Sequence, residues 1–359
     1  MDGIKIRLSL VMGYLGAVVG AGFASGQEIV QFFVSCGGAG YKGCILAMFL
    51  FASCGGILMY MAHCHSTGSY QEMLQELMGE RRSKLLDLLL AAFLFLGLSM
   101  MLSASGAVFH EHLYKPKEWG ILAAASLVAV FLYSGKNGLI KSYNVLVPAK
   151  LVLLLAITGY AALATDGTQT ETFTVFFYPR EEGGWIISAI LYVAYNFALA
   201  MVVLTEYQAL GTRKDGIWGA IWGGAVLGIL IILNYLALGK YLPVILHYEV
   251  PMLYIAGEIS PVTKAVYTVV LWVGILTTAI ANAYGFAQRF ASFTCMSYGL
   301  SLFITLILAL PISLQSFSAL VSKVYPLFGL LGIIILVVLV TKAGKEMATE
   351  IRAALAKGD

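Results

Sequence analysis

Apolar runs of about 20 residues recur along nearly the whole chain, and they restrict it to an integral membrane protein. A helix needs roughly 20 apolar residues to cross a hydrocarbon core about 30 Å thick. The chain has 359 residues, of which 60% are hydrophobic and 11% charged, and this excludes a soluble globular domain. The runs predict an all-α fold with ten spans, at 6–33, 39–64, 84–110, 119–134, 139–164, 184–210, 214–238, 259–291, 296–311 and 316–341.

The distribution of Lys and Arg predicts how the spans are oriented. With the N-terminus inside, fourteen of these residues fall in cytoplasmic segments and seven on the other face, while Lys150 lies within a span. Cytoplasmic loops of membrane proteins carry the excess of positive charge. We therefore expect a multi-pass protein of the plasma or inner membrane with both termini in the cytoplasm.

The spacing of the spans predicts an internal repeat. Pairing each span with the fifth one after it gives starting offsets of 178, 175, 175, 177 and 177 residues. Because five is an odd number, the second half must cross the membrane in the opposite sense, as in inverted-repeat transporters. We expect a first repeat at 1–164, an external connection at 165–183, a second repeat at 184–341 with an external hairpin near 241–258, and a cytoplasmic tail at 342–359. Ten unrelated helices of similar length would give a similar spacing.

Several classes of site are disfavoured by the sequence. The net charge of +3 comes without a basic, aromatic-rich run, so we expect no nucleic-acid partner. No G-x-x-x-x-G-K-[ST] motif is present, so ATP-driven pumping is unsupported. His63, Cys64 and His65 are close enough for a metal, but they lie where a span meets the surface, and we interpret them as interfacial residues.

The first span contains the segment GAGFASGQE (20–28), which predicts a broken helix. Three glycines within seven residues make unwinding cheap, because each costs a helix interior about 1 kcal/mol relative to alanine. Irregular backbone at this depth is tolerated where protein or a water-filled cavity supplies partners. The free N–H groups of the second half, starting near Ser25, would then suit a carboxylate. The alternative is close helix packing through small residues.

The equivalent place in span 6 is VAYNFALA (193–200), and it predicts a second break. Asn196 lies there between Tyr195 and Phe197, so an amide and two aromatic rings share the middle of the membrane. A single buried Asn is also a common means of joining helices, and this interpretation stays open.

Two ionisable residues, Glu28 and Lys150, lie well inside predicted spans. A charge at the bilayer centre costs at least about 2.5–3.5 kcal/mol, so it normally faces the bundle interior and finds a partner or a proton. Either residue is a candidate proton carrier. The alternative is a structural pair or hydrogen-bond anchor.

Span 8 carries GILTTAIANAYG (274–285), a candidate cation site. Gly274, Thr277 and Thr278 place a carbonyl and two hydroxyls around one turn, and oxygen ligands suit a hard cation such as Na⁺. Hydrogen bonding of each threonine to its own preceding turn is the commoner arrangement.

The motif VGAGFASGQEI (19–29), the ten spans and the chain length together resemble the YkvI-like family of putative amino acid permeases, within the amino acid–polyamine–organocation group that shares the LeuT fold. The resemblance implies spans 1 and 6 broken at mid-membrane, a substrate between them, and alternating access by rocking of spans 1, 2, 6 and 7. It places the substrate carboxylate at Gly20, Ala21, Gly22, Phe23, Ala24, Ser25 and Gly26, and the substrate side chain or amine at Tyr195, Asn196 and Phe197.

The resemblance also implies two alternatives for the coupling site. In sodium-coupled members, carbonyls of span 1 bind the cation together with a small residue and two hydroxyls of span 8. The matching residues here are Gly20 and Phe23 in span 1, and Gly274, Thr277 and Thr278 in span 8. Sodium-independent members place a span 5 lysine there instead, which Lys150 matches. A resident ammonium would repel Na⁺, so Na⁺-independent transport is favoured. An acidic residue at the position of Glu28 is not general among proteins of the wider fold.

The expected function is therefore secondary active transport, without enzymatic activity, of an amino acid or small amine-bearing solute. Either H⁺ or Na⁺ is a possible coupling ion, and no other cofactor is expected. A Na⁺-coupled symporter of the same fold and a ligand-sensing receptor subunit that does not transport are the main alternatives. An intramembrane enzyme lacks a nucleophile–base pair or metal set, and a channel fits the predicted breaks less well.

Overall fold

The computed structural model describes residues 3–67, 70–133, 151–163 and 184–355, and these fold into helices. The elements in chain order are α1 Gly3–Val18, α2 Ala21–Ser25, α3 Gln27–Phe32, η1 Val34–Ala39, α4 Gly40–His65, α5 Tyr70–Met78, α6 Glu80–Ala107, η2 Val108–His112, α7 Lys117–Tyr133, an unlabelled helix Leu151–Leu163, α9 Gly184–Glu206, η3 Tyr207–Leu210, α10 Arg213–Gly239, η4 Val244–His247, α11 Pro251–Ile259, α12 Pro261–Thr294, α13 Tyr298–Ser313 and α14 Phe317–Leu355. The predicted connection at 165–183 and Lys150 lie outside the described residues.

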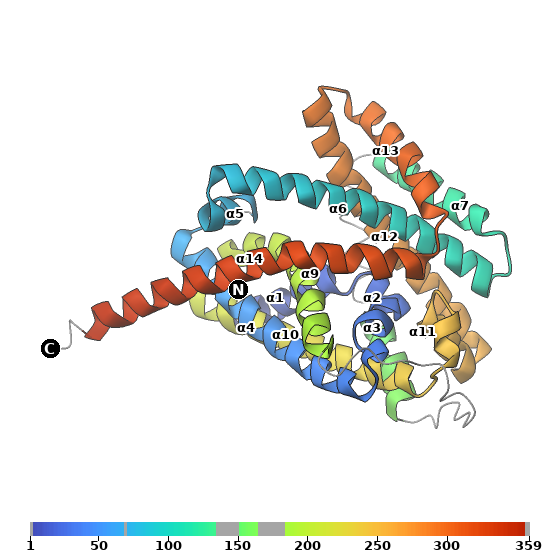
Figure 1. Ribbon diagram of the computed structural model, residues 1–359, viewed down its shortest axis with the longest axis horizontal. Coiled ribbons are helices and arrows are strands. Elements are labelled where there is room, and N and C mark those ends of the chain that lie inside the picture. Colours follow the sequence, from blue (N-terminus) through green and yellow to red (C-terminus); the bar gives the residue numbers. More distant parts are fainter. Residues whose placement is uncertain (1–2, 68–69, 134–150, 164–183, 356–359) are drawn as a thin grey trace.

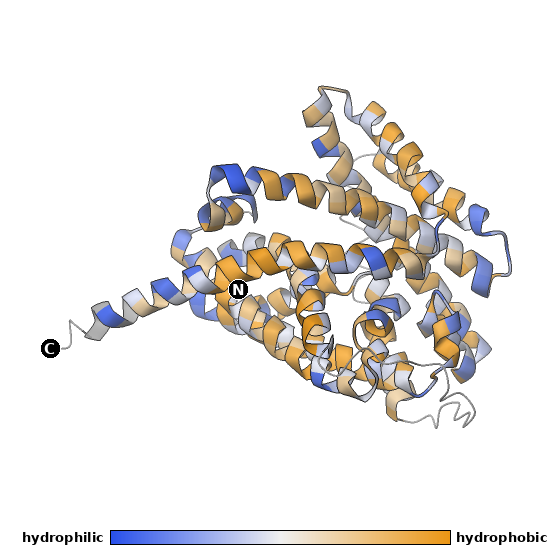
Figure 2. Cartoon of the chain, viewed as in Figure 1, coloured by the Kyte–Doolittle hydropathy of each residue, from blue (hydrophilic) through white to orange (hydrophobic). Residues whose placement is uncertain are grey.

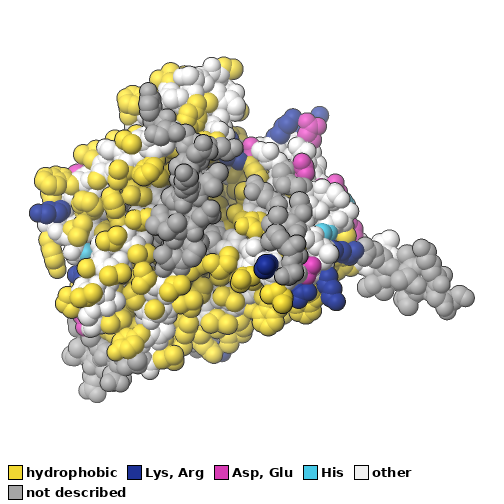
Figure 3. Space-filling view, turned by 180° about the vertical axis from the view of Figure 1, so that it is seen from behind, with side chains coloured by type: hydrophobic (Ala, Val, Ile, Leu, Met, Phe, Trp, Pro, Cys, Tyr) yellow, Lys and Arg dark blue, Asp and Glu magenta, His cyan; other side chains and the backbone are white. Residues whose placement is uncertain are grey.

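The helices match a protein that crosses the membrane several times. Those long and apolar enough to span a bilayer are α4, α6, α9, α10, α12 and α14, and Leu151–Leu163 and α13 are shorter apolar helices. Figure 2 shows apolar residues along the middle of these helices and polar residues toward their ends. From behind, a broad hydrophobic surface covers the middle of the molecule, and many charged side chains gather near the end from which the C-terminus projects (Figure 3).

Most predicted spans agree with helices to within a few residues, but span 6 differs from the prediction in its interior. The expected break at Tyr195, Asn196 and Phe197 is wrong, because α9 runs without interruption from Gly184 to Glu206. The Asn196 Nδ2 donates to Tyr192 O at 3.1 Å, within the same helix. No Gly or Pro lies between Trp185 and Glu206, so nothing in this segment lowers the cost of unwinding.

Helix packing divides the bundle into two groups that meet around α14. In the first group α4 packs against α10, α1 against α10, and α9 against both α4 and α14. In the second, α6 packs against α12, α7 and α13. Figure 1 shows α14 running through the bundle and projecting beyond it toward the C-terminus. It continues to Leu355, so it extends well past the predicted end of span 10 at residue 341.

Glycines allow the closest helix approaches. A Cβ on Gly228 of α10 would lie 2.1 Å from the Cβ of Met48 on α4. A Cβ on Gly332 of α14 would lie 2.2 Å from the carbonyl oxygen of Ala194 on α9. Small residues let backbones approach in this way, and within a membrane van der Waals packing is a main source of helix association. This packing fixes α9 and α14 side by side, next to the interrupted first span.

Candidate functional site

The first span is interrupted twice, at the glycines that the sequence indicated. Helix α1 ends at Val18, and α2 begins at Ala21 after Gly20. Gly26 then adopts φ +84° between α2 and α3, a conformation that favours glycine because it has no Cβ. A Cβ on Gly26 would lie 2.8 Å from Met252 Cγ, so α11 covers this interruption closely.

Backbone and side-chain bonds stabilise the irregular segment. The Ser25 hydroxyl donates to Gly22 O at 2.8 Å and accepts from Gln27 N at 3.3 Å, which joins the two short helices. The Tyr267 hydroxyl, from α12, donates to Ala24 O at 2.6 Å. The non-helical backbone is thus held by protein groups, as irregular structure at membrane depth requires.

The Glu28 side chain is buried inside this segment, with 3% of its surface exposed. It turns back toward α2, so that a Cβ placed on Gly22 would lie 2.1 Å from Glu28 Oε1 and 2.8 Å from the Tyr325 hydroxyl oxygen. The Tyr325 hydroxyl, from α14, lies beside the Glu28 carboxylate. The absence of a side chain at Gly22 is therefore what gives the carboxylate its place.

Tyrosines from α9 and α14 surround the carboxylate. The rings of Tyr195 and Tyr325 stack with centroids 4.6 Å apart and planes 10° apart. The Tyr195 hydroxyl lies beside the same carboxylate, and Tyr192 is close enough to interact with it electrostatically. Among the described residues, no group completes a hydrogen bond of standard geometry with the buried oxygens Glu28 Oε2, Gln27 Oε1, Tyr192 Oη and Tyr195 Oη. Buried polar atoms normally have partners, so this cluster has capacity for a ligand.

The other two predicted residues of span 6 do not share this arrangement. The Asn196 amide nitrogen bonds to its own helix, as described above. Phe197 is fully buried in the hydrophobic core. Of the three, Tyr195 is the residue that the fold brings to Glu28.

The candidate cation site on α12 has its hydroxyls directed at its own backbone. Thr277 Oγ1 donates to Gly274 O at 2.9 Å, and Thr278 Oγ1 donates to the same oxygen at 3.0 Å. These bonds explain both threonines without an ion, since they are the usual hydrogen bonds of helical threonine. The lone pairs of the hydroxyls remain chemically able to bind a cation, and Lys150, the alternative occupant, lies outside the described residues.

The comparisons with known proteins agree with this architecture. No family model matches the chain. Two proteins of Bacillus subtilis (strain 168) are similar: the uncharacterized membrane protein YkvI, 29% identical over 322 residues that cover 89% of this chain and 91% of YkvI, and the uncharacterized protein YyaD, 28% identical over 330 residues that cover 90% and 93%.

Two solved structures share the fold at low sequence identity. MhsT in complex with L-phenylalanine matches with a TM-score of 0.63 and 18% identity, over 92% of this chain and 88% of MhsT. Mhp1, a nucleobase-cation-symport-1 family transporter in a closed conformation with bromovinylhydantoin bound, matches with a TM-score of 0.53 and 16% identity, over 89% and 74%. The chain has a LeuT-like fold.

Aromatic rings close the bundle beside the Tyr195–Tyr325 stack. Phe93 of α6 and Phe328 of α14 lie with ring centroids 4.4 Å apart. The cavity that these rings and Tyr195 help to line measures about 10 Å³, roughly the room of a single water. A solute could not pass here without movement of α6 relative to α14.

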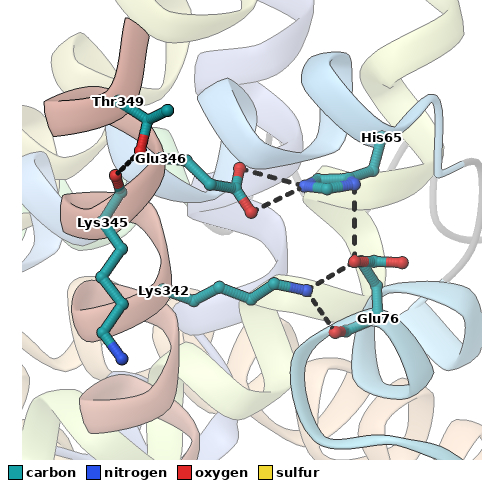
Figure 4. Close-up of polar contacts among 6 residues, drawn as sticks. All are labelled: His65, Glu76, Lys342, Lys345, Glu346 and Thr349. Carbon is teal, nitrogen blue, oxygen red and sulfur yellow. Dashed lines mark hydrogen bonds and ion pairs between the residues drawn. The ribbon is translucent and has the colours of Figure 1, made fainter. Parts of the chain in front are cut away.

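A polar cluster ties α14 to α4 and α5 at the end of the bundle from which the C-terminus projects (Figure 4). His65 Nε2 lies 3.0 Å from Glu346 Oε2, and His65 Nδ1 lies 3.5 Å from Glu76 Oε1. Lys342 Nζ lies 2.5 Å from Glu76 Oε1. The Lys342 ammonium holds the pKa of the Glu76 carboxyl below its usual value. The cluster therefore joins α4, α5 and α14 through polar contacts.

A second polar cluster at the same end fixes α5 to α6 and α12. The Tyr70 hydroxyl donates to Asp87 Oδ1 at 2.7 Å. Arg289 pairs with Asp87 at 3.1 Å and also donates to the Tyr70 hydroxyl. Helix α5 is thus attached to both groups of the bundle.

The opposite end of the bundle has its own set of ties. Glu111, after α6, accepts from Glu249 N at 2.7 Å and from Val250 N at 3.2 Å, which holds the segment before α11. The Glu249 carboxylate accepts from Phe317 N at the start of α14, and Lys117 Nζ lies 3.8 Å from Glu249 Oε1. Burial raises the pKa of Glu249. Polar contacts therefore join helices at both ends of the bundle.

Sequence reasoning missed Tyr325, Tyr192 and Gln27 as members of the site. Tyr192 precedes Tyr195 by three residues, a spacing that places both on one helix face, and this signal was readable. Tyr325 follows Ser322 and Lys323 in α14, and nothing in its local sequence indicates that it meets Glu28.

Proposed function

We propose that this protein is a secondary active transporter that moves an amino acid or small amine-bearing solute across the cell membrane by alternating access. Transport is Na⁺-independent, and Glu28 carries a coupled proton. The observation that carries the proposal is the buried Glu28 carboxylate, placed at the interruption of the first span and faced by tyrosines of α9 and α14.

The fold supports the proposal. Mhp1, which shares it, is named as a transporter, and both solved structures hold a small organic molecule. In LeuT-like transporters the substrate binds near mid-membrane, where a discontinuous helix supplies backbone groups.

A buried carboxylate supports proton coupling. Ionisable residues inside membrane helices are expensive, and they commonly mark ion or proton pathways. Thr277 and Thr278 of α12 donate hydrogen bonds to their own helix backbone, so their hydroxyls do not need Na⁺ as a partner. A Na⁺-coupled symporter of the same fold is the second candidate, and it rests on the same Gly274, Thr277 and Thr278.

Uptake into proteoliposomes tests the proposal. The purified chain is reconstituted and offered a panel of radiolabelled amino acids and amines, with H⁺ and Na⁺ gradients imposed separately. We expect accumulation under a proton gradient without Na⁺, its loss in Glu28→Gln, and retained exchange in that variant. Glu118→Gln, which alters an exposed carboxylate on α7, is the matched control.

Two outcomes would contradict the proposal. Accumulation driven by Na⁺ alone would favour the symporter. Binding of a panel member without uptake under any gradient would favour a receptor subunit that senses the ligand without transporting it.

A further inference from the structure

The carboxylate of Glu28 lies beside α2, within the interrupted part of the first span. Its Oε1 lies where a side chain of Gly22 would begin, within the segment 20–26 at which the family resemblance implies a substrate carboxylate. Glu28 and Gly22 are six residues apart, and the left-handed turn at Gly26 is what lets the side chain fold back. The chain therefore supplies a carboxylate of its own at this position.

A second carboxylate would be repelled from the same place. Two like charges a few ångströms apart in a water-poor interior disfavour each other strongly, and one must then be protonated or move away. None of the interactions of the Glu28 side chain with other described residues is with a Lys or Arg. A zwitterionic amino acid would bring its carboxylate to a site that already holds one.

The remaining groups of the site suit a cation. Glu28 Oε2 and Gln27 Oε1 are hydrogen-bond acceptors in the buried core, and neither completes a hydrogen bond with the part of the chain that the structure describes. The hydroxyls of Tyr195 and Tyr325 lie beside the Glu28 carboxylate, and a hydroxyl oxygen can accept a hydrogen bond from an ammonium group. An ammonium donates hydrogen bonds, and it would bring the positive charge that no Lys or Arg among the described residues supplies to Glu28.

We propose that Glu28 takes the place of a substrate carboxylate, and that the substrate is an organic amine without a carboxylate, whose ammonium pairs with Glu28 beside Tyr195 and Tyr325. This inference rests on the proposed function, because it names the substrate class of the same site. Of the two substrate classes in the proposed function, it selects amines over amino acids.

Matched pairs of ligands test the inference directly. Titration calorimetry on the full chain in detergent compares phenethylamine with L-phenylalanine, isopentylamine with L-leucine, and cadaverine with L-lysine. Each pair differs by one carboxylate. We expect the amine of at least one pair to bind about tenfold or more tightly than its amino acid, since an unpaired buried charge is costly.

Variants at residue 28 reverse or remove the preference. Glu28→Gln keeps the side-chain shape and should weaken amine binding about tenfold or more. Glu28→Ala vacates the place on Gly22 and should raise the affinity for the amino acid of the same pair. Glu118→Gln should leave both affinities unchanged. Retention of a single symmetric peak in size-exclusion chromatography shows that each variant is folded.

The outcomes separate this inference from the proposed function. Tighter binding of the amino acids to the wild-type chain, or amine binding by Glu28→Gln at wild-type affinity, would overturn the inference. If proteoliposomes accumulate amino acids and not amines, the inference fails and the transporter stands. If amines bind through Glu28 but never accumulate, the proposed transport function is wrong and the amine-binding site is supported. Absence of binding for all three pairs counts against both.

Discussion

The rings of Tyr195 and Tyr325 stack 4.6 Å apart, and this contact joins α9 to α14 beside the Glu28 carboxylate. The hydroxyls of both tyrosines lie beside that carboxylate. Phenylalanine at either position removes the hydroxyl and keeps the ring.

Tyr325→Phe and Tyr195→Phe should each destabilise the protein by up to about 1.5–3 kcal/mol, the usual worth of a hydrogen bond to a charged group. Each change keeps the stacked ring and removes a hydroxyl that lies beside the buried Glu28 carboxylate. Melting temperatures of the purified variants and the wild type in one detergent measure the loss. Wild-type melting temperatures in both variants would show that neither hydroxyl stabilises Glu28.

Gly22→Ala should disrupt the site, because its Cβ would lie 2.1 Å from Glu28 Oε1 and 2.8 Å from the Tyr325 oxygen. We expect a loss of about 1–3 kcal/mol, the usual cost of overpacking. Gly20→Ala is the matched control, since a Cβ there meets nothing within 4 Å. Thermal denaturation of both variants is the measurement. A Gly22→Ala protein as stable as Gly20→Ala would mean that the Glu28 side chain does not lie on Gly22.

Replacing Na⁺ by K⁺ should leave uptake unchanged, and Thr277→Val with Thr278→Val should have little effect. The two hydroxyls bond to Gly274 O, and the valines keep the shape of the side chains. Initial rates of uptake in Na⁺ and K⁺ buffers measure this for the wild-type and double-variant proteins. A Na⁺ stimulation that the valines abolish would establish the cation site instead.

Lys342→Ala should lower stability at neutral pH and much less in acid. The folded-state pKa of Glu76 is depressed, chiefly by the hydrogen bond from Lys342. The stabilisation is therefore present above the ordinary carboxyl pKa and is lost as the pH falls through the lowered value. Because both side chains are partly exposed, we expect less than about 1 kcal/mol.

Melting temperatures measured between pH 3 and pH 7 compare this variant with Lys84→Ala. The Lys84–Glu80 pair is 73% exposed on both sides, so its loss should leave the pH profile unchanged. A pH-independent effect of Lys342→Ala would show that the lysine acts through packing and not through Glu76.

Thiol labelling tests the predicted orientation. Cys64 and Cys295 are exposed, whereas Cys36, Cys44 and Cys54 are buried. If the termini are cytoplasmic, a membrane-impermeant maleimide should label Cys64 and Cys295 in inside-out vesicles and leave intact cells unlabelled. Cys64→Ser and Cys295→Ser assign the signal to each site. Labelling from the outside of intact cells would reverse the topology.

The sequence determined the class of the protein and the irregular part of its first span. Apolar length alone predicts the helices α4, α6, α9, α10, α12 and α14, because hydrocarbon thickness sets how many residues a span needs. The glycines at 20, 22 and 26 predict the interruption, since glycine lowers the cost of leaving the helix. The inverted repeat remains a prediction of the same spacing.

Tertiary structure decided which side chains meet. The sequence around Asn196 predicted a break in the helix, but the Asn196 amide bonds to Tyr192 O and α9 stays continuous. Glu28 had to find some partner, because a buried charge is costly, yet only the packing of α14 against α9 brings Tyr325 to it. A buried polar residue in the sequence therefore predicts that it has a partner. Which partner it meets depends on how helices that are distant in the sequence pack against one another.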